Sequence, residues 1–283
     1  MIGGLETHHI TRSFSSLRVN PDRMLAAFNQ LALIGATSDG GVDRVTFSET
    51  HLAARKWFRE EIERSGLEFH TDGAGNHSAI LPSSKDDDGR VAPHGFRGAY
   101  REVPIGGDQT LLIGSHLDSV PNGGRFDGAL GVMAALEVLK TVKESGINLK
   151  LNLEAIDFTD EEGTLVGLLG SAALAGHLSQ KDLVSPRGGR DKLIEGMARA
   201  DLSDKSMLNA ARPKDSLAGY LELHIEQGKR LERAGMDIGI VSAIVGIWSY
   251  RLAFIGRADH AGSTTMDDRL DASLGASAFT LAA

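Results

Sequence analysis

The sequence contains no cysteine. This absence excludes disulfide bonds, thiolate metal sites and a cysteine nucleophile. Any metal ion bound by the chain must therefore be held by His, Asp or Glu side chains. Such ligands favour a catalytic site over a structural zinc site.

An excess of basic charge and long apolar runs are also lacking. The 30 Lys and Arg residues face 38 Asp and Glu residues, giving a formal net charge of -8. Nucleic-acid binding usually needs a basic face, so we do not expect it. The opening residues, MIGGLETHHI, lack the basic start and apolar core of a signal peptide, and no run approaches the roughly 18 apolar residues that span a bilayer. We therefore expect a cytoplasmic protein that does not bind membranes.

What is present is a pattern of strands alternating with helices. The 283 residues are 41% hydrophobic, enough for one large core or two ordinary ones. The alternation predicts an α/β domain with a mostly parallel sheet. We expect helices at residues 21–34, 48–65, 128–143 and 170–178, and strands at residues 110–114, 149–158 and 219–225. Less regular structure is expected as a loose arm at residues 1–20, a turn at 72–76, a surface insertion at 83–108 and short helices or loops at 185–216.

The pattern changes near residue 238. Residues 238–255 are rich in β-branched side chains and predict two strands, and a helix is expected to begin near Leu270. We therefore divide the chain into a first domain at 1–237 and the start of a smaller α+β domain at 238–283.

The first chemical motif is GSHLDSVPNGGRFDGALG, at residues 114–131. His116 and Asp118 are two residues apart just past a predicted strand, so their side chains point the same way in extended backbone. The carboxylate could support the histidine or a neighbouring ligand, and Asp127 begins a predicted helix. Taken alone, the motif is more often a polar turn with a helix-capping aspartate.

The second motif is DFTDEEGT, at residues 157–164. Glu161 and Glu162 are adjacent and repel each other unless a cation offsets their charge. A metal ion would bind one carboxylate and leave the other as a base. By itself, the motif is more often a solvated acidic loop.

The third motif is LELHIEQG, at residues 221–228. If it is a strand, His224 lies on one face with Glu222 and Glu226. The opposite face, facing the core, then carries Leu221, Leu223 and Ile225. A lone strand histidine is usually only a polar surface residue.

Together the three motifs favour a metal site, because all of them follow predicted α/β strands, where such sheets place their sites. Four ligands and a spare carboxylate are what a two-metal hydrolase needs, and an aspartate at a helix start suits a bridging role. A serine hydrolase is disfavoured because no G-x-S-x-G motif occurs. Neither a P-loop nor a dinucleotide fingerprint is present.

At these motifs the sequence resembles the two-metal acylase and aminopeptidase-like amidohydrolases. The most similar branch holds N-carbamoyl-L-amino-acid hydrolases, allantoate amidohydrolases and β-ureidopropionases. The resemblance runs from about Thr11 to the end of the chain and includes the segments FSETHLAARKWF and DGAGN. The histidine within H-I-E-Q-G, where peptidase relatives carry an acidic ligand, points to this branch.

The resemblance implies a role for each motif residue. His116, Glu162 and His224 resemble metal ligands, Asp127 resembles the bridging aspartate, and Glu161 resembles the general base. The implied cofactors are two divalent ions, with zinc expected first and manganese, cobalt or nickel as alternatives.

Three further residues are implied in catalysis or substrate binding. Asp118 resembles the supporting carboxylate, and Gln227 resembles the glutamine that touches the ureido or amide end of the substrate. In GRADHAGSTTM, residues 256–266, His260 resembles the histidine that polarises the scissile carbonyl, sometimes from a partner subunit. Residues 238–283 are then the start of an inserted lid and dimerisation domain, and the full-length protein is expected to be a homodimer.

The sequence also departs from the family pattern. The family commonly has an arginine shortly after the glutamate pair, where this chain has Leu165 and Val166, and Thr265 replaces a proline. The chain ends at Ala283, whereas the family's last histidine ligand and its arginine for the substrate carboxylate lie further on. We therefore expect an incomplete chain that binds at most one metal ion tightly and hydrolyses little.

The function expected from the resemblance is metal-dependent hydrolysis of a non-peptide C–N bond. The substrate would be a small carboxylate-bearing molecule of the N-carbamoyl amino acid, ureido acid or allantoate type. Two alternatives stay open: an aminoacylase or dipeptidase of the same superfamily, and a catalytically inactive fragment that only binds ligand or dimerises.

Overall fold

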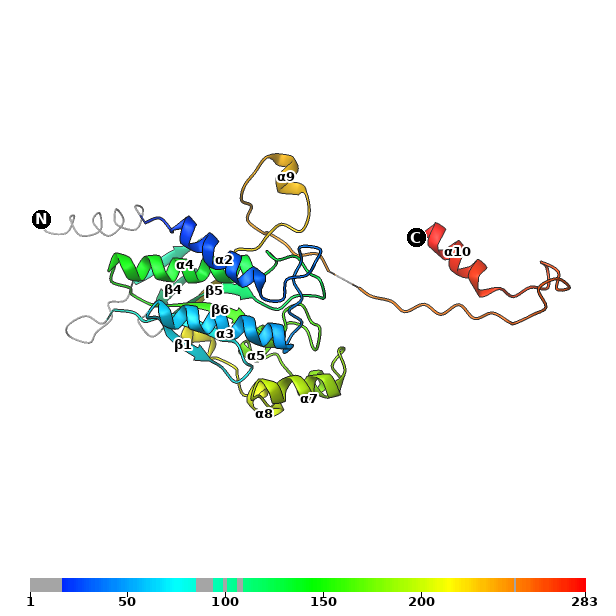
Figure 1. Cartoon of the computed structure of the whole chain (residues 1–283), viewed down its shortest axis with the longest axis horizontal. Helices are drawn as coiled ribbons and strands as arrows, with labels where there is room; N and C mark the ends of the chain where they lie inside the picture. The colour runs from blue at the N-terminus through cyan, green and yellow to red at the C-terminus, as the bar shows by residue number, and fades with distance from the viewer. Residues whose placement is uncertain (1–16, 85–93, 99–100, 106–108, 247) are drawn as a thin grey trace, which may run out of the picture. The chain divides into compact units, whose positions relative to one another are not determined.

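The computed structural model describes residues 17–84, 94–98, 101–105, 109–246 and 248–283 (Figure 1). It consists of two units, Met1–Gln227 and Gly228–Ala283, which are described separately below. The predicted arm at residues 1–20 falls largely, and the predicted insertion at 83–108 partly, outside the described residues.

The first unit is built on a five-stranded sheet with the order β1-β2-β6-β5-β7. Its strands are β1 (Glu68–Thr71), β2 (His77–Leu81), β5 (Thr110–His116), β6 (Asn152–Phe158) and β7 (Leu217–Leu221). Strand β5 runs parallel to both β6 and β7, while β1 and β2 join the sheet antiparallel. The predicted α/β class is confirmed, and its parallel strands are the three that lead to the chemical motifs.

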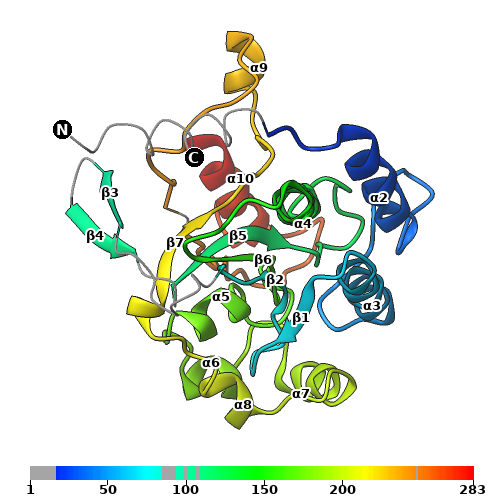
Figure 2. The ribbon, with the colours of Figure 1, turned by 90° about the vertical axis from the view of Figure 1, so that its left-hand side faces the viewer.

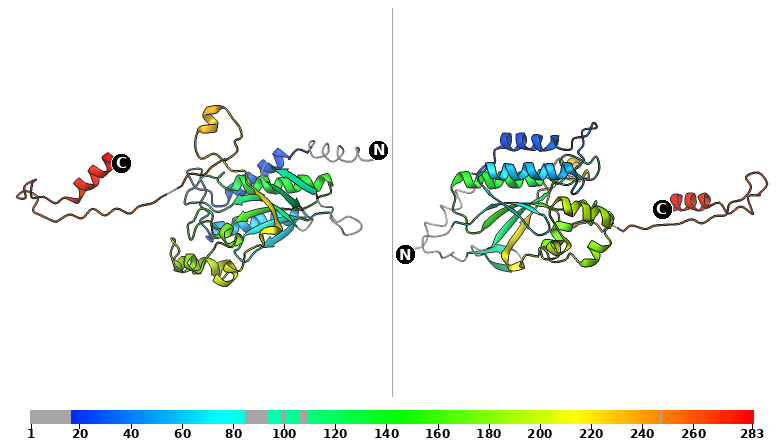
Figure 3. Two further views of the ribbon diagram at one scale, coloured as in Figure 1. Left: turned by 180° about the vertical axis from the view of Figure 1, so that it is seen from behind. Right: turned by 60° about the horizontal axis from the view of Figure 1, so that its bottom comes forward.

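Helices cover both faces of this sheet (Figure 2). The longer ones are α2 (Pro21–Leu33), α3 (Glu49–Arg64) and α4 (Ala129–Ser145). The shorter ones are α5 (Leu169–Leu174), α6 (Gln180–Val184), α7 (Arg190–Arg199), α8 (Asp204–Leu208) and the 3-10 turn η1 (Lys214–Ser216). Figure 3 shows the same arrangement from behind and from below.

Local sequence signals explain where the first helices begin. The side chain of Asn20 accepts a hydrogen bond from the backbone of Arg23, and Pro21 occupies the first turn of α2. Ser48 caps α3 by accepting from the backbone N–H of His51. The predicted helices at residues 21–34 and 48–65 are therefore confirmed.

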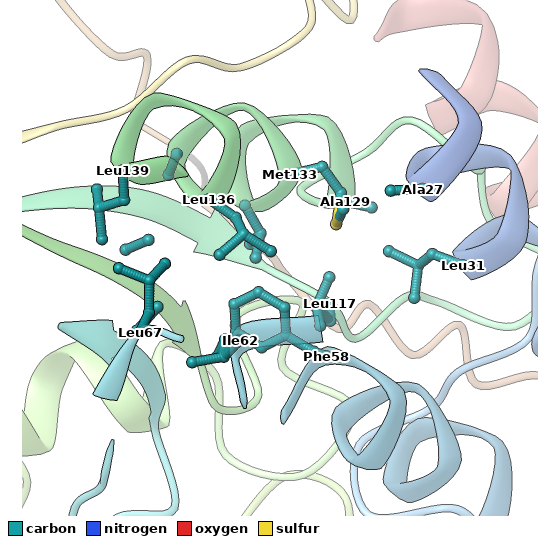
Figure 4. Close-up of a cluster of buried hydrophobic side chains, with 14 of the residues drawn as sticks. Ala27, Leu31, Phe58, Ile62, Leu67, Leu117, Ala129, Met133, Leu136 and Leu139 are labelled. Atoms are coloured by element: carbon teal, nitrogen blue, oxygen red, sulfur yellow. The ribbon is translucent and has the colours of Figure 1, made fainter. Parts of the chain in front are cut away.

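The hydrophobic side chains form separate clusters on the two faces. One lies under α2, α3 and α4 and includes Leu31, Phe58, Ile62 and Leu136, none more than 1% exposed (Figure 4). The other lies among α5, α6, α7 and α8 and is centred on fully buried residues such as Phe47 and Leu169. Burial on both faces fixes the sheet, so its strand ends are a rigid platform for a site.

The third motif is less regular than its sequence pattern predicts. Strand β7 ends at Leu221, so His224 lies past the strand. Leu221 and Leu223, expected to face the core, are 57% and 45% exposed, so that prediction was wrong. The carbonyl oxygen of Leu223 lies only 2.4 Å from where a Cβ on Gly131 would be, so close approach to α4 needs a glycine there.

The segment at residues 83–108 contains two short strands, β3 (His94–Gly98) and β4 (Arg101–Ile105). They pair antiparallel as a sheet of their own.

The second unit contains two helices, α9 (Arg230–Ala234) and α10 (Ala272–Ala282). The helix expected near Leu270 is confirmed, with Asp271 as its N-cap. The two strands expected at residues 238–255 are absent from the described part of that range, so this prediction was wrong. The reason is that an apolar β-branched run forms a strand only when its backbone groups pair with a neighbouring strand, and two strands alone are marginal. Among the described residues no helix is long and apolar enough to cross a membrane.

Candidate metal centre

The candidate site lies where β5, β6 and β7 end. His116 is the last residue of β5, and the loop that follows carries Asp127 to the start of α4. Glu161 and Glu162 follow β6, and His224 follows β7. Because the three strands are parallel neighbours, their carboxyl ends bring these loops to one edge of the sheet.

Three of the predicted ligands meet at this edge. His116, Asp127 and His224 each offer a ligand atom, and these atoms all lie within 4.8 Å of one another. Asp127 Oδ1 is 3.1 Å from Nε2 of His224 and 3.9 Å from Nε2 of His116. A set of two imidazole nitrogens and a carboxylate is typical of catalytic zinc sites and suits other divalent transition metals.

In both histidines the ring nitrogen Nδ1 already has a hydrogen-bond partner. Nδ1 of His116 lies 2.9 Å from the carbonyl oxygen of Asp118, and Nδ1 of His224 lies 2.9 Å from that of Ile225. A carbonyl can only accept, so each Nδ1 carries the proton in a neutral ring and each Nε2 keeps its lone pair. This tautomer suits a metal ligand, so the residues present fit a bound cation.

Gly128 allows the His116 ring to lie against the start of α4. Its φ is +62°, and a Cβ there would lie 2.5 Å from the His116 ring atoms. A side chain at this position would therefore strain the backbone and displace the histidine.

Asp118 is fully buried and holds the glutamate pair by its backbone. Its carboxylate accepts hydrogen bonds from the N–H groups of Glu161 (3.3 Å) and Glu162 (3.2 Å) and from the hydroxyl of Thr46 (3.1 Å). Its nearer oxygen is 3.6 Å from Nδ1 of His116, so the backbone carbonyl of Asp118 is the closer partner of that ring. The carboxylate of Asp118 therefore binds the backbone of Glu161 and Glu162, and its predicted supporting role in catalysis stays a prediction.

The charges at this edge are unbalanced toward carboxylates. Burial raises the pKa of Glu161, of Glu162 and of Asp118 above their usual ranges. Burial lowers the pKa of His116, but the negative charges led by Asp118 and Glu161 outweigh it, so that pKa is raised. Glu161 Oε2 lies 3.5 Å from Nε2 of His116. A cation at this position would offset the mutual repulsion of these groups.

The sequence analysis missed the residue that shapes the loop carrying Glu161 and Glu162, which is called the glutamate loop below. The buried carboxylate of Asp160 accepts hydrogen bonds from the hydroxyl of Thr164 and from three backbone N–H groups, those of Leu165, Val166 and Gly167. These hydrogen bonds hold the loop after Asp160 in a compact turn. Its position directly before the glutamate pair was the only signal for this role.

A buried ion pair beneath the site was also missed. Arg55 of α3 binds Asp157 of β6 at 2.9 Å, and the other carboxylate oxygen of Asp157 accepts from the backbone N–H of Leu117 at 2.7 Å. Burial raises the pKa of Asp157 to about 6, against the opposing charge of Arg55. The pair connects α3, β6 and the residue after His116. The available signal was a charged residue between two apolar residues of the strand, Ile156 and Phe158.

The two residues predicted to contact substrate have different surroundings. Gln227 donates a hydrogen bond from Nε2 to Asp127 Oδ2 at 2.8 Å. His260 belongs to the second unit, where its Nδ1 accepts hydrogen bonds from the backbone N–H groups of Gly262 and Ser263, both at 3.1 Å. The predicted substrate contacts of Gln227 and His260 stay predictions.

Comparisons with known proteins agree with the motifs. The sequence matches peptidase family M20/M25/M40 over residues 112–280. It is 35% identical to the N-carbamoyl-L-amino acid amidohydrolase of Geobacillus stearothermophilus, over 89% of this chain and 58% of that protein. It is 33% identical to the allantoate amidohydrolase of Bacillus subtilis, over 85% of this chain and 54% of that protein.

Among solved structures, the chain is similar to an amidase of the hydantoinase/carbamoylase family from Burkholderia phymatum. The TM-score is 0.69 at 31% identity, covering 94% of this chain and 59% of that chain. The chain thus spans little more than half the length of the relatives it matches.

Proposed function

Since the chain belongs to peptidase family M20/M25/M40, we propose that the whole protein is a metal-dependent hydrolase of a non-peptide C–N bond. Its substrates would be N-carbamoyl amino acids, ureido acids or allantoate-like molecules. The observation that carries this proposal is the meeting of His116, Asp127 and His224 within 4.8 Å, with Glu161 3.5 Å from His116. The relatives named as N-carbamoyl-L-amino acid and allantoate amidohydrolases support the substrate class.

The residues that would hold the cofactor are His116, Asp127, Glu162 and His224. We propose two divalent ions, zinc first, with Asp127 as the ligand that they would share, as the resemblance implies. Such ions, when bound, polarise the substrate carbonyl and make water more acidic.

Glu161 would move the protons of the reaction. Its side chain is 37% exposed, so water can reach it, and burial raises its pKa. A carboxylate with a raised pKa is a better base, and once protonated it is an acid that can pass the proton to the leaving nitrogen.

His260 and Gln227 would recognise the substrate. Because Nδ1 of His260 accepts two backbone hydrogen bonds, the proton of the neutral ring is on Nε2, which can donate to a carbonyl oxygen that gains negative charge. The amide of Gln227 would exchange its contact with Asp127 for the ureido or amide end of the substrate. We further propose that the whole protein is a homodimer, as the resemblance implies.

A substrate panel tests this proposal. The purified whole protein is incubated with N-carbamoyl-L-amino acids, allantoate and ureidoglycolate, and in parallel with N-acetyl amino acids and dipeptides. We expect release of ammonia or amino acid from the first group, loss of activity after treatment with a chelator, and recovery when zinc or manganese is added. Cleavage only of the second group would favour an aminoacylase or dipeptidase, and activity that survives metal removal would contradict the proposal.

A further inference from the structure

We propose that Arg187, which lies outside all three motifs, is a positioning residue for the metal centre. Its guanidinium fixes the backbone of Glu162, the proposed metal ligand that follows β6. This inference rests on the proposed function, because it takes Glu162 to be a ligand. It adds a residue that neither the motifs nor the family resemblance pointed to.

The contact is made by one planar group on two consecutive carbonyls. Arg187 lies between α6 and α7. Its Nη2 donates to the carbonyl oxygen of Glu162 at 3.0 Å, and its Nε donates to that of Gly163 at 2.5 Å. A guanidinium presents its donors in a fixed plane, so two such bonds hold both peptide groups in one orientation.

The segment around Arg187 is closely fitted to the glutamate loop. The N–H of Gly188 donates to the carbonyl of Leu165 at 2.8 Å, and a Cβ on Gly188 would lie 2.2 Å from the carbonyl oxygen of Thr164. Gly163 has a φ of +68°, and a Cβ there would lie 2.5 Å from Nη2 of Arg187. Both glycines leave room for this approach, so the contact is not a loose surface encounter.

With Arg187 in place, the backbone polar groups of the glutamate pair are all bonded. The N–H groups of Glu161 and Glu162 donate to Asp118. The carbonyl of Glu161 accepts from the N–H of Leu168 at 3.3 Å, and the carbonyl of Glu162 accepts from Arg187. A side chain leaves the backbone in a direction set by φ and ψ, so these four contacts determine where the two carboxylates can point.

Zinc affinity of the protein tests the inference without any substrate. Zinc is titrated into the purified, metal-free whole protein in competition with a chromophoric chelator. We expect Arg187→Ala to weaken zinc binding by roughly 10- to 100-fold, as is typical when a residue that orients a ligand is removed. Arg187→Lys should fall between this variant and the wild type, because an ammonium cannot hold two carbonyls in one plane.

Arg190→Ala is the matched control. Arg190 is three residues away and also makes several hydrogen bonds, but their partners are Asp204 (2.9 and 2.7 Å) and the carbonyl of Leu183 (3.0 Å), not the glutamate loop. We expect this variant to lower the melting temperature and to leave zinc affinity unchanged.

Wild-type zinc affinity in Arg187→Ala, an equal loss in Arg190→Ala, or a wild-type protein that binds no zinc would each overturn the inference. Failure of the proposed function is distinguishable, because it would appear as a protein that binds zinc but releases no ammonia from any carbamoyl or ureido substrate.

Discussion

At the scale of single residues, the adjacent glutamates have the same chemistry but different neighbours. Glu161 is close to His116 at 3.5 Å, and after burial the charge of Asp118 is what most raises its pKa. For Glu162 the charge that most raises the pKa after burial is that of Asp127, the central carboxylate. The assignment of the base to Glu161 and of a ligand to Glu162 stays a proposal, and substitution tests it.

Substituting each glutamate in the whole protein tests the role of base and the role of ligand separately. Glu161→Gln should keep its metal and lose turnover by roughly 10²- to 10⁴-fold, because a general base is removed. Glu162→Gln should instead lower the metal content, measured by elemental analysis of the purified variant. If both variants lost metal equally and neither lost activity selectively, the assignment of base and ligand would be wrong.

Gly128 gives a second test at this scale. Gly128→Ala should weaken metal binding and lower the free energy of unfolding by about 1–3 kcal/mol, because the new Cβ meets the His116 ring and φ is positive. Gly124→Ala is the matched control in the same loop, since a Cβ there has no atom within 4 Å. Calorimetry and zinc titration of the two variants should differ, and equal effects would show that Gly128 does not position His116.

At the scale of elements, the loop after β6 has a backbone that local sequence preference would not choose. Asp160 and Leu168 both have positive φ, +53° and +50°, although neither is glycine. The four hydrogen bonds to the buried carboxylate of Asp160 hold this conformation in place. Asp160 therefore keeps the loop that carries the glutamate pair rigid. It can do so without touching a substrate.

This explanation predicts a stability cost for Asp160→Asn. An amide oxygen can replace only part of the carboxylate's acceptor capacity, so at least one buried N–H loses its partner. The free energy of unfolding, measured with urea, should fall by roughly 1–3 kcal/mol. Asp182→Asn, at an exposed helix cap, serves as the comparison. A cost at Asp160 no larger than that at Asp182 would contradict the explanation.

The sequence was sufficient for elements with strong periodic patterns and clear caps. The helix from Glu49 to Arg64 and the strand from Asn152 to Phe158 lie where the apolar pattern puts them. The pattern misled at residues 219–225 because alternation alone does not say where pairing stops, and β7 pairs with β5 only as far as Leu221. The β1–β2 hairpin was not predicted, although its turn at residues 72–76 was.

For the site, the sequence indicated ligand types and missed the residues that hold them. His116, Asp127 and His224 could be found because their loops follow strands that proved to be parallel neighbours. Arg55 and Arg187 could not be found in this way. Each acts through contacts between segments far apart in the chain, and spacing along one segment carries no signal for such contacts.

At the scale of the whole molecule, the predicted family is confirmed by the match over residues 112–280. The chain spans 58% of the Geobacillus stearothermophilus relative and 54% of the Bacillus subtilis relative. The domain boundary expected at 237/238 and the expectation of an incomplete chain both stay predictions. The activity, the second metal ion and the dimer belong to the whole protein and are tested there.

The central claim is that His116, Asp127 and His224 hold a divalent metal ion. Crystals of the whole protein grown with zinc, measured above and below the zinc absorption edge, test it most directly. The account predicts an anomalous peak about 2 Å from Nε2 of at least one of these histidines and from a carboxylate oxygen of Asp127. An anomalous map without a peak among these three side chains, in crystals whose zinc is bound elsewhere on the protein, would contradict it.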